Sequence, residues 1–112
     1  FEFMKKCHVG ILPSSRNKAR ILGPPVKLYD YLSVGLPVVA NYIGGWSEVI
    51  KREKIGVTTD DDPESFAKGI YQLIQDKDLY YKYANNALRA IKEKYNWDKA
   101  TEPLTLLIKK IL

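Results

Sequence analysis

Lys27 and Asp30 carry opposite charges three residues apart at the start of an expected helix, which places them on the same face of that helix. A lysine ammonium binds phosphate, and a carboxylate accepts hydrogen bonds from the two hydroxyls of a ribose. The first peptide N–H groups of a helix have no partner within the helix and bind phosphate readily. Gly23, Pro24 and Pro25 precede them. The pattern is typical of a phosphate-and-ribose site.

The alternative is a plain salt bridge between Lys27 and Asp30 on a solvated helix, worth a few tenths of a kcal/mol. Spacing alone slightly favours this alternative. Ser14 follows an expected strand at the same edge of the sheet, where its hydroxyl contacts a ligand or forms a turn. Gly44 and Gly45 either make room for a ligand or form a turn, and we expect Glu48 to bind backbone N–H groups.

Short apolar runs and turn residues define the elements that position these side chains. Parallel strands are predicted at residues 8–12, 37–40 and 56–59, with a loop over residues 14–24. Five helices are predicted. The first spans 26–34, with Pro25 in its first turn and Gly35 at its end, and the second spans 47–54, capped by Ser47. The third begins at Pro63 after the cap Asp62, the fourth spans 78–95, and the fifth is a C-terminal helix with Pro103 in its first turn or at a kink.

The alternation of strands and helices predicts an α/β fold with a three-layer, Rossmann-like parallel sheet and helices on both faces. About three strands and five helices are expected. Three strands are few for a sheet that buries both faces. We therefore interpret residues 1–112 as a single partial domain, the C-terminal portion of a larger one.

Composition excludes several classes of site. The chain has one cysteine, Cys7, and one histidine, His8, too few for a tetrahedral zinc site or an internal disulfide. We expect Cys7 to be a buried core thiol in a reducing compartment. The apolar runs are too short to span a membrane and a signal peptide is not recognisable, so a cytoplasmic location is expected.

The formal net charge of +5 favours an anionic partner or reflects a solvated lysine-rich surface. The first long loop gathers four basic residues without an acidic one: Arg16, Lys18, Arg20 and Lys27. Aromatic side chains among lysines can stack on single-stranded nucleic acid. Tyr80 and Tyr83, however, fall on the apolar side of a predicted helix, so core packing is preferred and nucleic acid is not the favoured partner.

The segment from Pro25 to Ala40, followed by Gly44, Gly45 and Glu48, resembles the C-terminal domain of group 1 glycosyltransferases. These are retaining enzymes with two Rossmann-like domains, the GT-B fold. The resemblance continues through Gly56-Val57, Asp62-Pro63-Glu64, Phe66-Ala67 and Leu73-Ile74 to residues 95–98, and so covers nearly the whole chain.

The resemblance implies a nucleotide-sugar site in which Asp30 binds the ribose and the peptide N–H groups of Val26, Lys27 and Leu28 approach the diphosphate. Pro25 and Ser14 complete the predicted site. The family usually has Glu where this chain has Asp30, and Glu where it has Leu22, eight residues earlier. Neither a catalytic residue nor a metal ligand is assigned to this chain, and the donor is a substrate rather than a cofactor.

The implied function is transfer of a glycosyl group from a nucleoside-diphosphate sugar to an acceptor by the intact enzyme. The fragment alone would be inactive, because the N-terminal acceptor domain is not in it. The last helix would cross back toward that domain. The partners expected are the donor, the acceptor domain, a peripheral membrane contact of the intact enzyme, and a second copy of the fragment at its exposed sheet edge. Two alternatives stay open: a non-catalytic nucleotide- or anion-binding module, and a basic nucleic-acid-binding domain.

Overall fold

Three parallel strands form the centre of the computed structural model, which describes all 112 residues. The strands are β1 (Gly10–Leu12), β2 (Val38–Asn41) and β3 (Gly56–Thr59), in the order β1-β2-β3. Val38 is in register with Gly10 on one side and with Gly56 on the other. The predicted parallel sheet is confirmed. β1 begins at Gly10, two residues later than expected, where its N–H donates to Pro37 O on the chain entering β2.

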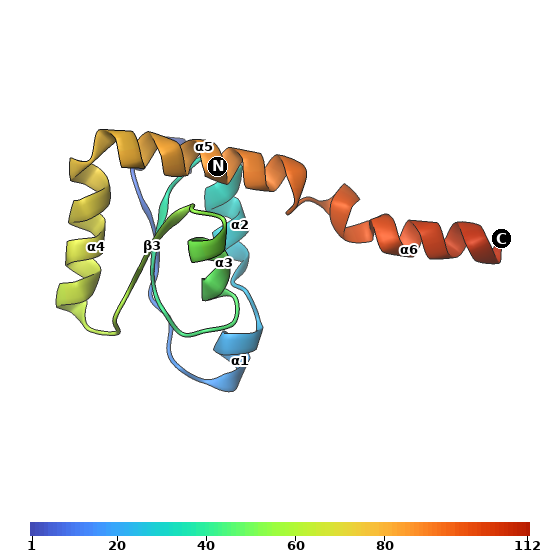
Figure 1. The fold of residues 1–112 in the computed structure, drawn as a ribbon, viewed down its shortest axis with the longest axis horizontal. Coiled ribbons are helices and arrows are strands. Elements are labelled where there is room, and N and C mark those ends of the chain that lie inside the picture. Colours follow the sequence, from blue (N-terminus) through green and yellow to red (C-terminus); the bar gives the residue numbers. More distant parts are fainter.

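Helices cover both faces of this sheet, as predicted (Figure 1). α2 (Val26–Ser33) and α3 (Ser47–Arg52) lie on one side, α4 (Pro63–Gln75) lies on the other, and α5 (Lys77–Glu93) crosses one end. All four residues of β2 are buried, because successive side chains of a central strand enter the two different layers. The chain therefore forms a three-layer α/β arrangement.

The main core lies between the sheet and the layer of α2 and α3. It is formed by apolar side chains from these helices, the strands, the loop after β2 and α5: Leu12, Leu28, Leu32, Val38, Ala40, Ile43, Trp46, Ile50, Ile55 and Ala87. On the opposite face Gly69 of α4 approaches Val39 and Thr59 so closely that a Cβ would lie 2.8 Å from the Thr59 methyl group. The glycine allows α4 to pack directly on the sheet.

Local capping signals locate most helix boundaries correctly. Asp62 accepts a hydrogen bond from Ser65 N at 2.8 Å and Pro63 is the first residue of α4, as predicted. Gly35, with φ of 73°, follows α2 in the left-handed conformation. Asn96 accepts from Lys99 N at 2.9 Å and separates α5 from α6 (Trp97–Ile111). Pro25 is the N-cap of α2 rather than its first helical residue.

Three predictions about local structure are wrong. The segment 14–24 is not entirely a loop, because Asn17 caps a short helix, α1 (Lys18–Leu22), by accepting from Arg20 N. The chain thus has six α-helices, and a 3-10 turn, η1 (Met4–Lys6), precedes β1. Ser47 does not cap α3: its hydroxyl accepts from Ile43 N and donates to Gly44 O. Cys7 is only half-buried, with its thiol donating to Phe3 O.

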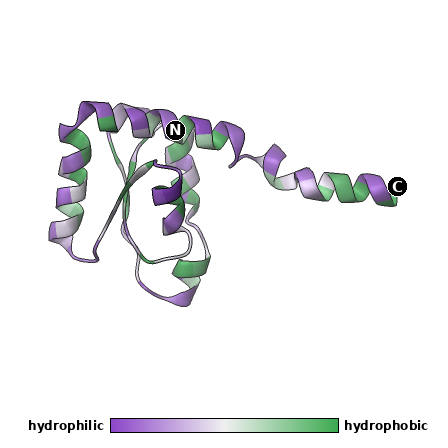
Figure 2. Cartoon of the chain, in the orientation of Figure 1, coloured by the Kyte–Doolittle hydropathy of each residue, from purple (hydrophilic) through white to green (hydrophobic).

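α6 extends away from the rest of the molecule (Figures 1 and 2). None of its residues is buried, and Pro103 lies inside it rather than in its first turn. Several large apolar side chains of the helix are exposed: Leu104, Leu106, Leu107, Ile108 and Ile111. The molecule measures 55 × 31 × 24 Å as a result of this projection. None of the six helices has the length and apolar character needed to cross a membrane.

Candidate functional site

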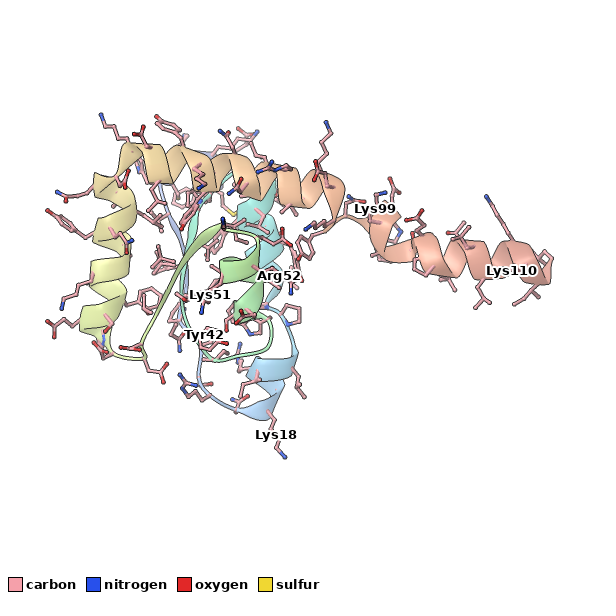
Figure 3. The ribbon with its side chains drawn as sticks, in the orientation of Figure 1. Lys18, Tyr42, Lys51, Arg52, Lys99 and Lys110 are labelled. Atoms are coloured by element: carbon pink, nitrogen blue, oxygen red, sulfur yellow. The ribbon has the colours of Figure 1, made fainter.

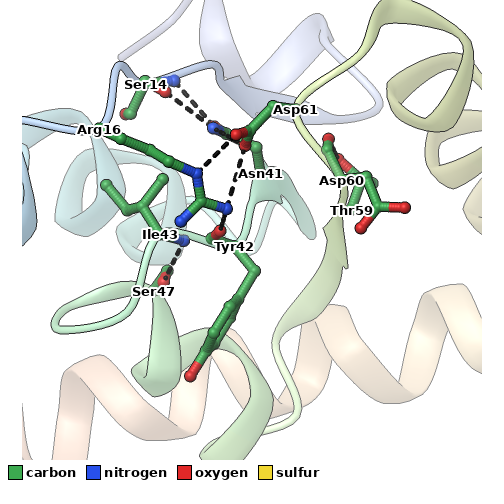
Figure 4. A network of polar contacts seen from close by, with 9 residues as sticks. All are labelled: Ser14, Arg16, Asn41, Tyr42, Ile43, Ser47, Thr59, Asp60 and Asp61. Carbon is green, nitrogen blue, oxygen red and sulfur yellow. Dashed lines mark hydrogen bonds and ion pairs between the residues drawn. The ribbon is translucent and has the colours of Figure 1, made fainter.

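Polar side chains from the ends of all three strands meet at one edge of the sheet (Figure 4). Asn41, the last residue of β2, is buried and stands at the centre of this network. Its amide oxygen accepts from Ser14 N at 2.8 Å, and its amide nitrogen donates to Ser14 O at 2.7 Å and to Asp61 at 2.9 Å. One side chain thus fixes the loops that follow β1 and β3 relative to β2.

Arg16 closes the same network from the loop after β1. Its guanidinium forms an ion pair with Asp61 and donates to Tyr42 O at 2.6 Å. Hydrogen bonds from Arg16 and then Asn41 lower the pKa of Asp61 below its ordinary value, because they favour the charged carboxylate. The sequence groups Arg16 with three other basic residues of a loop that has no acidic residue, and the structure pairs it with a carboxylate from the loop after β3.

Of the two glycines after β2, only Gly45 approaches α1. Gly45 has φ of 53°, and a Cβ there would lie 2.0 Å from the backbone oxygen of Ile21. The indole of Trp46, itself buried, donates to Arg20 O at 2.6 Å. The close approach at Gly45 therefore accommodates α1 rather than leaving open space. The Tyr42 hydroxyl donates to Glu48 at 2.7 Å, so Glu48 binds a side chain and not the expected backbone N–H groups.

The N-terminus of α2 carries the two charged residues singled out in the sequence. Lys27 is exposed and Asp30 is half-buried. The ion pair that the spacing slightly favoured is not among the five that the structure contains. Both side chains are thus free of each other, and neither takes part in the Asn41 network.

The backbone at this helix start offers fewer free donors than expected. The N–H of Leu28 donates to Pro25 O at 3.1 Å, so one of the three peptide groups predicted to face a diphosphate is already used. The N–H groups of Val26 and Lys27 have no acceptor within the chain. Leu28 is fully buried and anchors the helix start to the core.

The predicted site residues form two groups. Ser14 is bound by Asn41. The other residues lie at the start of α2, with Pro25 as its N-cap and Val26, Lys27, Leu28 and Asp30 inside it. No hydrogen bond or ion pair joins Ser14 to Lys27 or Asp30. Both groups follow β1 in the chain, and open α/β sheets bind ligands outside the carboxyl ends of their strands. The arrangement is suited to binding an anion at α2 and hydroxyl groups at Asp30.

Sequence reasoning missed Asn41 and Asp61. Asn41 directly follows the apolar run 37–40. This position could have indicated a buried amide, which requires hydrogen-bond partners. Its partners lie 27 and 20 residues away, beyond the reach of local patterns. His, Cys, Asp and Glu side chains form no cluster of three suited to a metal ion.

Comparisons with known proteins give one family model and several curated relatives. The family model described as group 1 glycosyl transferases matches residues 1–76. An uncharacterized glycosyltransferase of Methanocaldococcus jannaschii is 35% identical over 70 residues, which cover 62% of this chain and 18% of that protein. A sucrose synthase of Denitrovibrio acetiphilus is 36% identical over 75 residues, which cover 62% of this chain and 10% of that protein.

Comparison of structures leads to the same fold. The crystal structure of WaaG, a glycosyltransferase involved in lipopolysaccharide biosynthesis, matches with a TM-score of 0.70 at 17% sequence identity. The match covers 94% of this chain and 27% of WaaG. The chain spans less than a fifth of the two curated relatives named above, and it corresponds in fold to a part of a larger protein.

Proposed function

Because the chain belongs to the group 1 glycosyl transferases, we propose that it forms part of the nucleotide-sugar donor site of a longer glycosyltransferase. One observation carries this proposal: the N-terminus of α2 combines the unpaired N–H groups of Val26 and Lys27 with a lysine and a carboxylate that do not neutralise each other. The intact enzyme transfers a glycosyl group from a nucleoside-diphosphate sugar to an acceptor hydroxyl.

Each residue of the proposed site has a distinct role. The ammonium of Lys27 and the two free N–H groups face the diphosphate, whose negative charge grows as the sugar departs. Preorganised donors of this kind lower the barrier because they stabilise charge that develops in the transition state. Asp30 accepts hydrogen bonds from the ribose hydroxyls. Pro25 and Leu28 set the direction of the helix start, and Ser14 lines the same edge of the sheet.

The rest of the enzyme supplies what this chain does not. A separate N-terminal domain binds the acceptor, so the fragment by itself is inactive. The free edge of β1 is where preceding strands of the same sheet join, and Ile11 of that strand, 47% exposed, becomes covered. In the isolated fragment this edge pairs with a second copy. The single cysteine is in keeping with a cytoplasmic enzyme, which contacts the membrane only peripherally.

The test compares two anions on the full-length protein. Asp30→Ala should lower the affinity for a nucleoside diphosphate about tenfold or more, since hydrogen bonds to a charged acceptor are worth about 1.5–3 kcal/mol. The affinity of Asp30→Ala for inorganic pyrophosphate should be unchanged. Lys27→Ala should lower the affinity for both ligands. Isothermal titration calorimetry measures all three proteins.

The matched control is Asp78→Ala, which removes an exposed carboxylate from the first turn of α5. It should leave both affinities unchanged. Unchanged nucleotide affinity in Asp30→Ala would show that the ribose contact is elsewhere. If DNA binds to the protein more tightly than the nucleotide and loses affinity steeply with salt, the nucleic-acid alternative replaces the proposal.

A further inference from the structure

We propose that the free edge of β3 binds an extended, acidic peptide segment of a partner protein, which adds a strand to the sheet. β3 is the last strand in the order β1-β2-β3 and pairs only with β2. This edge lies apart from the start of α2, so the proposal does not depend on the donor site. Unpaired strand edges are templates for added strands.

Half of the backbone groups of β3 are hydrogen-bonded to β2 and the other half are unpaired. Ile55 O accepts from Val38 N at 3.1 Å, and Thr59 O accepts from Tyr42 N at 2.8 Å. Alternate residues of a strand direct their backbone groups to opposite sides, so the N–H and C=O groups of Gly56 and Thr58 face away from β2. They have no partner in another element. Gly56 is buried and Thr58 is half-buried, so the groups of Thr58 are the ones that a short extended peptide reaches directly.

A groove runs along this edge between α3, α4 and α5. It comprises two adjoining hollows of 390 and 450 Å³ that share Val57 and Thr58 in their walls. Lysines from the three helices and from the residues after α3 line it: Lys51, Lys54, Lys68 and Lys82. Lys51 lies over the ring of Tyr42, 5.0 Å from its centroid, beside β3 (Figure 3).

The charge of the groove is mostly uncompensated. Lys68 lies 3.6 Å from Glu64, whereas Lys51, Lys54 and Lys82 form no ion pair within the chain. Asp60, at one end, is the only carboxylate in the walls. Acidic side chains on an added strand would be attracted along the whole groove.

The same charge argues against other occupants. A second copy of this chain would bring identical lysines to the pairing, and like charges on strand edges oppose such contacts. A nucleic acid would satisfy the lysines but not the alternating N–H and C=O groups of Gly56 and Thr58. Only an acidic strand complements both features.

The experiment uses the full-length protein and a short fluorescent peptide of alternating Glu and Val. Fluorescence anisotropy should show binding that weakens as salt is raised. Methylating every second peptide nitrogen, which removes the donors facing β3, should weaken binding about tenfold or more. A peptide with Lys in place of Glu should not bind. Thr58→Pro should reduce affinity similarly, because its N–H faces the free edge, while Thr58→Val should retain binding.

Proline is tolerated where a strand N–H faces outward, and circular dichroism checks that Thr58→Pro is folded. If it is not, the methylated peptide on the unaltered protein decides. Equal binding of the methylated peptide would overturn the proposal in favour of simple charge attraction. No binding, stronger binding of an oligonucleotide that displaces the peptide, or self-association that Thr58→Pro abolishes would also overturn it.

Discussion

Asn41 shows how much of this sheet edge depends on one side chain. Its amide makes three hydrogen bonds, to both backbone groups of Ser14 and to the carboxylate of Asp61. Arg16 reaches the same carboxylate, so the loops after all three strands are joined. Buried polar groups rigidify a structure when all are satisfied and are costly when one partner is lost.

Asn41→Ala should therefore lower the free energy of unfolding by about 1–3 kcal/mol, because Ser14 loses both partners and Asp61 loses one donor. Denaturation in urea, followed by circular dichroism, measures the change. Asn85→Ala, an exposed asparagine on α5 without a hydrogen bond, is the control and should change stability by no more than about 0.5 kcal/mol. Equal stabilities of the two variants would contradict the role given to Asn41.

At the scale of elements, the loop after β2 and helix α1 fit each other closely. Gly45 approaches the backbone of Ile21, and Trp46 donates to Arg20 O. α1 has only five residues and cannot be stable alone. The position of α1 therefore depends on this contact. The position of the segment that leads from α1 to the start of α2 depends on it as well.

Gly45→Ala should displace α1 and destabilise the protein by about 1–3 kcal/mol, since a Cβ would collide with the Ile21 carbonyl and φ is positive. Gly44→Ala is a matched control: φ there is 79°, but nothing lies within 4 Å. Gly44→Ala should lower the free energy of unfolding by about 1 kcal/mol, because of the positive φ alone. Thermal unfolding monitored by circular dichroism compares the two variants, and an equal loss of stability would show that the contact with α1 is unimportant.

Local patterns were sufficient to predict the strands and most helices. Short apolar runs indicated β2 and β3, and the Asp62-Pro63 pair gave the start of α4. α1 was missed because a five-residue helix shows little apolar periodicity, although Asn17 was an available cap. The Asn41 network and the Gly45 contact depend on residues 20 or more positions apart, and only the folded chain reveals them.

At the scale of the whole molecule, two features indicate a part of a larger protein. α6 has no buried residue and exposes a row of apolar side chains. In the proposed full-length enzyme, these side chains would pack against the N-terminal domain. β1 exposes Ile11 at the other free edge of the sheet. The comparisons agree, since the chain covers 27% of WaaG.

The most direct test of the donor site is a crystal structure of the full-length protein with a nucleoside diphosphate. We expect diphosphate oxygens about 3 Å from the N–H groups of Val26 and Lys27, with the ribose hydroxyls bound to Asp30. A nucleotide bound elsewhere, with the start of α2 left free, would contradict it.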